Sequence, residues 1–314
     1  MSVYNGSNFL DQSIRAILAQ TFQDFEFIII DDASTDRTPE IIKQFAEQDP
    51  RIKSFRNQQN IGPAGFIRNL NFGCRQAKGK YIARIDHDDI SRQDRFYLQY
   101  DFLENNPDVF IVGAALRKVD ESGEYLGLMI PPENDEQIRK MMPKKISLYH
   151  PVIMFRKSFY DDFYRDKMRY CEDYDFYLRV MTDGLKMANL KDCLLDYRIL
   201  QNSLSREQDK VIKNLFVNQS KEFYKERLQK GIDSYDQFDP ENFLNIYKNP
   251  SKELLRKAIK VSKIYFDFIG FRKLMLIYQN TCKKDAFFLS NLFFLYAGSR
   301  VFNYYVKITN YIKH

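Results

Sequence analysis

The sequence predicts an α/β protein in which a mostly parallel sheet is flanked by helices and followed by an α-helical C-terminal extension. Within residues 1–205, short apolar segments alternate with segments of helical periodicity, a pattern typical of strand–helix–strand units with parallel strands. Two of the apolar segments end in aspartates. From residue 206 to residue 314 the periodicity is helical, which predicts a second domain.

The elements of the first domain are expected as follows. Val3 and Tyr4 end a first strand, which turns at Asn5 and Gly6. Further strands are expected at 25–30, 52–55, 81–85, 109–116, 125–130, 150–155, 185–190 and 194–199. Helices are expected at 7–18 with Ser7 as the N-cap, at 38–46 with Pro39 at the first position, and at 64–77, 92–104 and about 170–181.

Three carboxylates follow the apolar segment that ends at Ile85: Asp86, Asp88 and Asp89. Carboxylates this close repel one another unless a cation or protons neutralise them, and oxygen ligands suit Mg²⁺ or Mn²⁺, which can in turn hold a diphosphate. An acidic turn that caps the next helix is the alternative for an isolated motif of this kind. Because parallel strands end at one edge of a sheet, this cluster and Asp31-Asp32 are expected to face the same crevice.

Composition limits the class of protein. The 314 residues are 44% hydrophobic and 29% charged, as in an ordinary globular chain. Four widely separated cysteines indicate neither a zinc site nor a disulfide framework, and they fit a reducing cytoplasm. No signal peptide and no apolar run of about 18 residues is found, so we expect a cytoplasmic protein without a spanning helix.

Six motifs occur in order along the chain. They are Ser2-Val-Tyr-Asn5, Ile30-Asp-Asp-Ala-Ser-Thr-Asp36, Asn60-Ile-Gly62 with Arg68-Asn69, Ile85-Asp-His-Asp-Asp89, His150-Pro151 and Glu172-Asp173-Tyr-Asp175. Taken together, residues 1–205 resemble the family 2 glycosyltransferases, which have the GT-A fold. One such motif is weak evidence, whereas six in order are strong.

The resemblance implies a nucleotide-sugar site. Asp32 corresponds to the residue that accepts a hydrogen bond from the uracil ring, and Asp88 corresponds to the metal ligand. Asp86 corresponds to the carboxylate that supports the ribose and the metal site. The remaining residues implied at the nucleotide-sugar are Val3, Tyr4, Asn5, Asp31 and Arg68. The expected cofactor is Mn²⁺ or Mg²⁺. Considered without the other motifs, Asp32 could be a turn residue that caps the following helix, and Arg68 could be a solvated helix arginine.

The resemblance also implies a catalytic base. Asp173 corresponds to the aspartate that removes the proton of an acceptor hydroxyl during an inverting displacement. The alternative is that Glu172, Asp173 and Asp175 stabilise a helix N-terminus, and the two roles are compatible. His150 and Glu172 are candidates for a contact with the acceptor or the phosphates, but His150 could equally be a packed structural histidine.

Three departures from the family pattern stand out. Family members usually have a complete apolar strand before the position of Met1, so the first strand is predicted to be truncated. Leu200 stands where many members carry a histidine, which leaves the third metal ligand open. No tryptophan is present, so the Q-x-x-R-W motif of processive synthases is absent, and addition of a single sugar is expected.

These observations predict an inverting, metal-dependent enzyme that moves one hexosyl or N-acetylhexosaminyl group from a UDP-sugar to a glycan or lipid-linked glycan of a bacterial envelope polymer. The alternatives are a sugar nucleotidyltransferase, which should open with a glycine-rich phosphate loop, and a non-catalytic nucleotide- or glycan-binding scaffold. No nucleic-acid partner is predicted, and the sequence does not define an oligomeric state.

The C-terminal extension differs from the rest of the chain in charge. Residues 243–314 hold 13 lysines and arginines but three acidic residues, and helices are expected at 211–228, 240–247, 252–263, 264–281 and 286–311. A basic amphipathic helix can lie on an anionic membrane, so peripheral contact with the inner face of the cytoplasmic membrane is one expectation. Packing of these aromatics on the catalytic domain or on a second subunit is the other.

Overall fold

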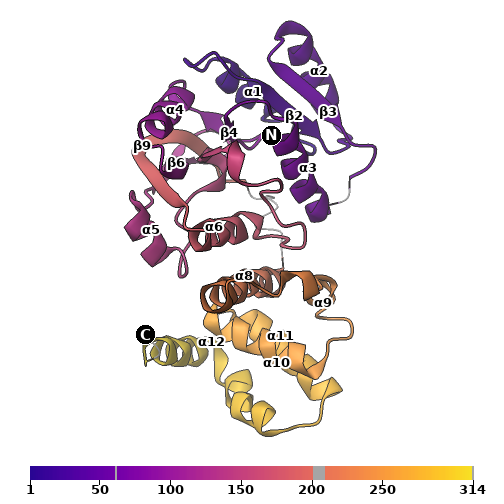
Figure 1. The fold of residues 1–314 in the computed structure, drawn as a ribbon. Coiled ribbons are helices and arrows are strands. Elements are labelled where there is room, and N and C mark those ends of the chain that lie inside the picture. The colour runs from indigo at the N-terminus through magenta and orange to yellow at the C-terminus, as the bar shows by residue number, and fades with distance from the viewer. Residues whose placement is uncertain (61, 201–208, 313–314) are drawn as a thin grey trace. The chain divides into compact units, whose positions relative to one another are not determined.

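A computed structural model describes residues 1–60, 62–200 and 209–312 of the chain (Figure 1). The chain divides into two compact units, Met1–Ser203 and Leu204–His314. The first unit is α/β and the second is helical, which confirms the predicted fold class. The sequence-based boundary at residue 205, like Ile61 of the third motif, lies outside the described residues.

Sheet A of the first unit contains three parallel strands in the order β1-β2-β3. Strand β1 covers Ser2–Val3, β2 covers Phe27–Asp31 and β3 covers Ile52–Arg56. Helices α1 (Leu10–Leu18) and α2 (Thr38–Gln48) connect them, as the periodicity predicts. The prediction that Ser7 caps α1 is wrong, because the helix starts at Leu10 and the N-cap position is Phe9, without a side-chain hydrogen bond.

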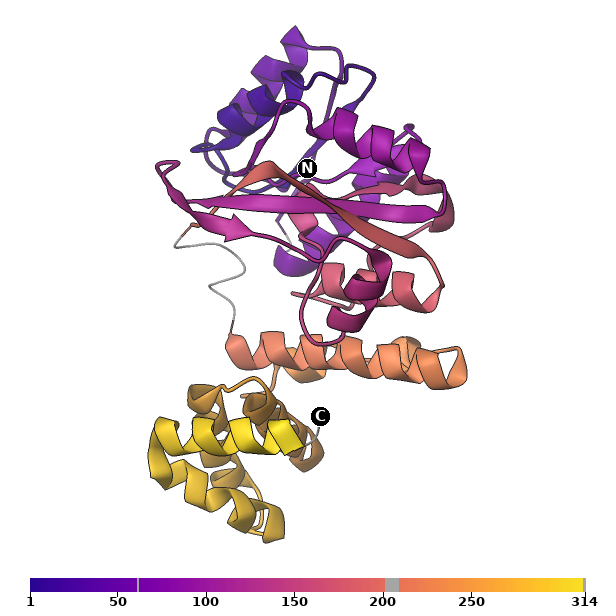
Figure 2. The same cartoon turned by 90° about the vertical axis from the view of Figure 1, so that its left-hand side faces the viewer.

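Sheet B is mixed and contains the strand order β4-β8-β6-β9-β5, and β7 pairs with β6 on the edge opposite β9. Its strands are Tyr81–Ala83, Ile90–Ser91, Val109–Val119, Tyr125–Met129, Met154–Arg156 and Lys186–Arg198, numbered β4 to β9 in that order. The long strands β6 and β9 run in parallel side by side, whereas the other pairs are antiparallel (Figure 2).

Two predicted features of sheet B are corrected. Strand β9 is continuous, where the sequence suggested two strands, because register shifts opposite Ala114 and Ala115 absorb the polar residues between them. The expected strand at 150–155 begins at Met154, because His150–Val152 form a 3₁₀ turn around Pro151. A second 3₁₀ turn, Lys157–Phe159, follows β8.

The remaining helices of this unit are α3 (Gly62–Gln76), α4 (Arg95–Asn105), α5 (Asp135–Met141) and α6 (Glu172–Thr182). Helix α5 was not predicted from its sequence. Its cap could have revealed it, since Asn134 accepts a hydrogen bond from the Gln137 N–H at 3.0 Å, the offset of a capping box. The apolar faces of the helices pack on the two sheets and form the core.

The second unit contains α8 (Lys210–Lys230), α9 (Glu241–Leu244), α10 (Lys252–Ile264), α11 (Phe268–Thr281) and α12 (Ala286–Ile312), with a 3₁₀ turn at Tyr235–Gln237. Helix α11 begins later than predicted because Asp267 caps it by accepting from the Gly270 N–H. Helix α12 is kinked at Gly298, where φ is 81°. None of the helices described combines the length and apolarity needed to cross a bilayer.

Candidate active site

An acidic cluster follows strand β4. One carboxylate oxygen of each of Asp86, Asp88 and Asp89 lies within 4.8 Å of the others. Asp89 is buried, and Asp86 and Asp88 are half-buried. Burial first, and then the charge of Asp86, raises the pKa of Asp88; burial and the two neighbouring carboxylates raise that of Asp89 well above its usual value. The fold therefore keeps the three carboxyl groups close together although their negative charges repel one another.

The chain around the cluster leaves part of this charge uncompensated. Arg84, which is buried, forms an ion pair with Asp86. One oxygen of Asp89 accepts from the Arg198 N–H at 2.9 Å, but its Oδ2 is buried with no hydrogen-bond partner among the described residues. Buried carboxylates that converge while retaining an unpaired oxygen are suited to a divalent cation, so the residues fit the expected metal.

A second acidic turn ends strand β2. Asn57 donates to Asp32 Oδ1 at 2.5 Å and Asn60 donates to Asp32 Oδ2 at 2.9 Å. Asp31 forms an ion pair with Arg56 at 3.2 Å, and both aspartates are buried. Ala33 adopts a φ of 61°, which turns the chain sharply behind them. This carboxylate pair is thus fixed at the end of sheet A.

The end of strand β1 lies between these two acidic turns. The Thr35 N–H donates to the Asn5 side chain at 2.8 Å, which ties residue 5 to the β2 turn. On the other side, a Cβ added to Gly6 would lie 2.5 Å from the His87 ring. The two turns therefore flank β1, in agreement with the shared crevice that the sequence predicts. Tyr4, at the same point, is 46% exposed.

A third acidic group stands at the start of helix α6. Asp173 accepts a hydrogen bond from the Tyr174 N–H at 2.7 Å, consistent with a role at the helix N-terminus. Although residue 172 keeps some solvent access, burial of its carboxyl group raises the pKa of Glu172 to about 8, with Asp173 adding to the effect and Asp86 contributing a smaller one. The charge of Asp86 therefore contributes to the raised pKa of Glu172 at the start of α6.

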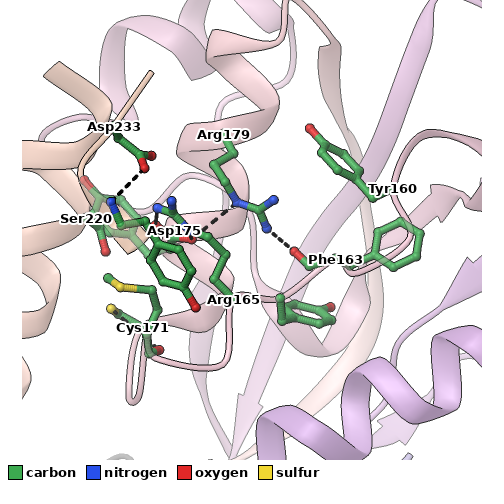
Figure 3. A network of polar contacts seen from close by, with 12 residues as sticks. Tyr160, Phe163, Arg165, Cys171, Asp175, Arg179, Ser220 and Asp233 are labelled. Atoms are coloured by element: carbon green, nitrogen blue, oxygen red, sulfur yellow. Dashed lines mark hydrogen bonds and ion pairs between the residues drawn. The ribbon is translucent and has the colours of Figure 1, made fainter. Parts of the chain in front are cut away.

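Two arginines fix the first turn of α6 to the preceding loop. Asp175 is buried and forms ion pairs with Arg165 and Arg179, and Arg179 also donates to the Phe163 carbonyl. Figure 3 shows the Arg179 guanidinium between Asp175 and Phe163. Asp175 thus forms its ion pairs in the protein interior. These ion pairs fix the first turn of α6, which also contains Asp173.

The other two predicted site residues differ in their surroundings. His150 is buried, and its Nε2 lies 2.8 Å from the Tyr164 hydroxyl. Burial, and to a lesser degree Arg84, lowers its pKa well below the usual value, so the ring is neutral. Arg68 is exposed on α3, and no hydrogen bond or ion pair of the described residues joins it to either aspartate cluster.

Several residues of the site were not identified from the sequence. Arg56, Arg84, Asn57 and Arg198 all contact its aspartates, and Tyr197 lies close enough that burial and the cluster's charges raise its pKa to about 12. One signal was present for Arg84, the only charge within the apolar run Tyr81–Ile85, since a charge in a buried strand requires a partner. The others carried no local signal.

A unit with a parallel sheet, acidic turns at the ends of two of its strands and a third acidic pair at a helix start has the architecture of a GT-A glycosyltransferase. The model of the family described as "Glycosyl transferase family 2" matches residues 1–163. The chain belongs to this family of glycosyltransferases.

Two relatives illustrate the similarity. The chain is 36% identical over 216 residues to the O-antigen biosynthesis glycosyltransferase WbnJ of Escherichia coli, a match that covers 66% of this chain and 80% of WbnJ. It is 34% identical over 212 residues to the glycosyltransferase MJ1057 of Methanocaldococcus jannaschii, covering 66% of this chain and 72% of that protein.

Two solved structures share the fold. Staphylococcus aureus TarS 1-349 in complex with UDP-GlcNAc superimposes with a TM-score of 0.62 at 13% identity, covering 98% of this chain and 90% of that one. The mannosyltransferase PcManGT of Pyrobaculum calidifontis, in complex with GDP-Man and Mn²⁺, gives a TM-score of 0.54 at 14% identity, covering 98% and 82%.

Proposed function

We propose that this protein is an inverting glycosyltransferase that moves one sugar from a UDP-sugar to a hydroxyl group of a growing cell-envelope glycan. The observation that supports this most strongly is the Asp86-Asp88-Asp89 cluster with an unpaired buried oxygen, in the same unit as the acidic start of α6. The similarity to an O-antigen biosynthesis enzyme supports the envelope glycan as the acceptor.

The nucleotide binds at the β2 turn in this proposal. Asp32 accepts a hydrogen bond from the uracil ring N–H, and Asn57 and Asn60 hold its carboxylate in a single orientation. Val3, Tyr4 and Asn5 line the neighbouring strand end, with Asp31 behind them. Arg68, exposed on α3, reaches the base or the phosphates from the rim. The complex of TarS with UDP-GlcNAc supports a uridine donor.

The acidic cluster holds the divalent cation. Asp88 and Asp86 are the proposed ligands, and Asp89, the third member of the cluster, supplies the remaining buried carboxylate. When bound, Mn²⁺ or Mg²⁺ neutralises charge on the donor's diphosphate, which makes UDP a better leaving group. The Mn²⁺ complex of PcManGT supports this cofactor. Arg84 neutralises part of the charge of Asp86 from the interior.

Asp173 acts as the general base. Its carboxylate takes the proton of the acceptor hydroxyl while that oxygen forms a bond to the anomeric carbon, and the bond from this carbon to the UDP oxygen breaks on the opposite face. One displacement inverts the configuration. Glu172, with a pKa near 8, is protonated at neutral pH and is a candidate to donate a hydrogen bond to the acceptor or the phosphates. His150 is neutral, buried and bound to Tyr164, so we assign it a structural role.

The C-terminal unit meets the membrane that carries the acceptor. Helix α12 exposes Leu289, Phe293 and Tyr296, at 61%, 63% and 75%, along one side. Phe288, Phe294 and Phe302 of the same helix are buried in the unit, where the rings of Phe271 and Phe302 lie 4.8 Å apart. An exposed apolar strip in a unit with excess lysine and arginine fits an anionic lipid surface at the inner face of the cytoplasmic membrane.

A screen of nucleotide-sugars tests the proposed reaction. Thermal stabilisation by UDP-sugars in Mn²⁺, exceeding that by GDP- or ADP-sugars, is expected because a ligand that binds the native state raises apparent stability. Release of UDP from the stabilising donor should then require metal and increase when acceptor is added. Release of pyrophosphate from UTP in the presence of a sugar 1-phosphate, with formation of the UDP-sugar, would identify a nucleotidyltransferase. Binding without turnover, with any acceptor glycan, would identify a scaffold.

A further inference from the structure

One arginine side chain joins the acidic cluster to two other parts of the first unit. Arg198 is the last residue of β9, and it is only 5% exposed. In the described part of the chain its guanidinium donates four hydrogen bonds, and all four acceptors are neutral oxygens. Burying a positive charge costs free energy unless the surroundings compensate it, so the position of this side chain needs a physical reason.

The pairing of the strands explains how residue 198 reaches both neighbours. Strand β9 lies between β5 and β6, and it runs antiparallel to β5 with Ile90 opposite Asp196. Continued for two residues, this register places Arg198 opposite Asp88. On its other edge Arg198 is the partner of Val119, the last residue of β6. Arg198 therefore stands between the acidic cluster and the turn of the β6–β7 hairpin, residues 120–124.

On the β5 side, Arg198 binds two consecutive aspartates of the cluster. Its backbone N–H donates to Asp89 Oδ1 at 2.9 Å, and its Nε donates to the Asp88 carbonyl at 3.0 Å. The first bond orients one carboxylate, and the second fixes the backbone that carries the next. Three carboxylates with oxygens within 4.8 Å repel one another when no cation is bound, and these two bonds oppose the opening of the loop.

On the β6 side, the same guanidinium holds the hairpin turn. Its Nη1 donates to the Glu121 carbonyl at 2.8 Å and to the Asp120 carbonyl at 3.2 Å. The Asp120 carbonyl also accepts from the Gly123 N–H at 3.1 Å, a bond within the turn. The planar fork of an arginine can bind these carbonyls and the Asp88 carbonyl at once, whereas the compact ammonium of a lysine cannot span them.

Helix α1 supplies the remaining contacts of the guanidinium. The Gln12 side chain accepts from Nη2 at 3.3 Å, and the guanidinium carbon lies 4.6 Å from the centre of the Phe9 ring, a cation–π contact. With four hydrogen bonds and one ring face engaged, the guanidinium is held in a single orientation. Displacement of the Asp88 backbone therefore displaces the hairpin turn as well.

We propose that Arg198 is a positioning residue for the divalent cation. It holds the loop of Asp88 and Asp89 in the arrangement that binds the cation, and it couples this loop to the hairpin turn. The inference rests on the proposed function, because the cation is part of it. Coupling between two sites is reciprocal, so a cation at the cluster also orders the turn.

Binding of Mn²⁺ alone to the full chain, measured by electron paramagnetic resonance without nucleotide, tests the hold on the cluster. Arg198→Met removes the guanidinium and is expected to weaken Mn²⁺ affinity by at least about tenfold, as for other residues that support metal ligands. Arg198→Lys keeps the charge but loses the fork, so its affinity should lie between those of the Met variant and the wild type. Arg117→Met is the matched control, because it removes an exposed arginine of β6 that pairs with Asp196, and it should bind Mn²⁺ like the wild type.

Exchange of the Gly123 amide with solvent, measured by NMR, tests the coupling. In the wild type, saturating Mg²⁺ should slow this exchange by at least about fivefold, because the bond from the Gly123 N–H shares its acceptor with Arg198. In Arg198→Met, saturating Mg²⁺ should leave the exchange rate unchanged. The wild-type measurement needs no substitution, so it decides the question even if the Met variant does not fold.

A folded Arg198→Met variant with the Mn²⁺ affinity of the wild type would overturn the proposal. A wild-type chain that binds Mg²⁺ without slower exchange of the Gly123 amide would overturn it as well. Wild-type protein that binds neither cation would contradict the metal of the proposed function, and this inference with it. A chain that shows both effects but transfers no sugar would contradict the proposed reaction alone and would support the role of Arg198.

Discussion

The α-carbon of Gly6 faces the ring of His87 so closely that a Cβ at residue 6 would lie 2.5 Å from the ring carbon Cδ2. The contact joins the end of β1, next to the proposed uridine site, to the loop that holds the aspartates proposed to bind the metal. It allows the two halves of the candidate site to approach, and only glycine fits there without movement of a neighbour.

Gly6→Ala should therefore lower both stability and activity. We expect a destabilisation of about 1 to 3 kcal/mol, as for overpacking in a core, and a weaker affinity for UDP, measured by thermal unfolding and by titration calorimetry. The double variant Gly6→Ala/His87→Ala should recover part of the stability, since it removes the ring. A single variant as stable as the wild type would show that the loops are free to separate.

Asp173→Asn should abolish transfer while leaving donor affinity nearly unchanged, because the base acts on the acceptor hydroxyl. General-base catalysis contributes about 10²- to 10⁴-fold, so kcat should fall by at least that lower factor. Asp183→Asn, at the opposite end of α6, is the control. Retention of more than about a tenth of the wild-type kcat would remove Asp173 from the role of base.

Asp88→Ala should weaken UDP binding only when metal is present. In Mn²⁺ the variant should bind less tightly than the wild type, and in EDTA the two proteins should bind alike, because the lost interaction passes through the cation. Asp94→Asn, outside the cluster, is the control. The metal assignment fails if the Asp88 variant gains as much UDP affinity from Mn²⁺ as the wild type does.

The raised pKa of Glu172 predicts a pH dependence of stability. Between the unfolded value of 4.5 and the folded value of about 8, the native state binds more protons than the unfolded state, so the stability of the native state falls as the pH rises through this window. Glu172→Gln stays neutral, and its Tm relative to wild type should rise between pH 5 and about pH 8, measured in EDTA. Glu136→Gln, exposed on α5, should follow the wild type throughout. A Tm difference that is constant with pH would exclude a shifted Glu172.

Phe293→Ser/Tyr296→Ser should reduce flotation of the protein with anionic vesicles. Each lysine or arginine near such a surface contributes about 1 kcal/mol, so wild-type binding should need anionic lipid and decrease in high salt. Leu276→Ser, an exposed apolar residue on α11, is the matched control, and truncation after Asn242 should remove binding. Wild-type protein that stays unbound, or doubly substituted protein that floats equally well, would exclude α12 as the contact.

Much of the fold follows from local sequence signals. Helix α2 begins with Thr38 and Pro39, and the periodicity of α10 gave its limits to within a residue, because these signals depend on neighbours along the chain. The continuous course of β9 could not be foreseen, because the bulge that joins its two apolar halves exists only against β6. The Ser7 cap failed for a similar reason, since the Ser7 N–H instead donates to the Asp36 carboxylate.

The sequence by itself determined which residues could do chemistry: the aspartates that end β2 and β4, and the acidic pair that starts α6, are local features of a strand end or a helix end. The tertiary structure alone decided their partners and protonation. Asp89 is bonded to Arg198, 109 residues away, and burial raises the pKa of Glu172. Long-range contacts and desolvation depend on which distant segments the fold brings together, and no spacing along the chain reports them.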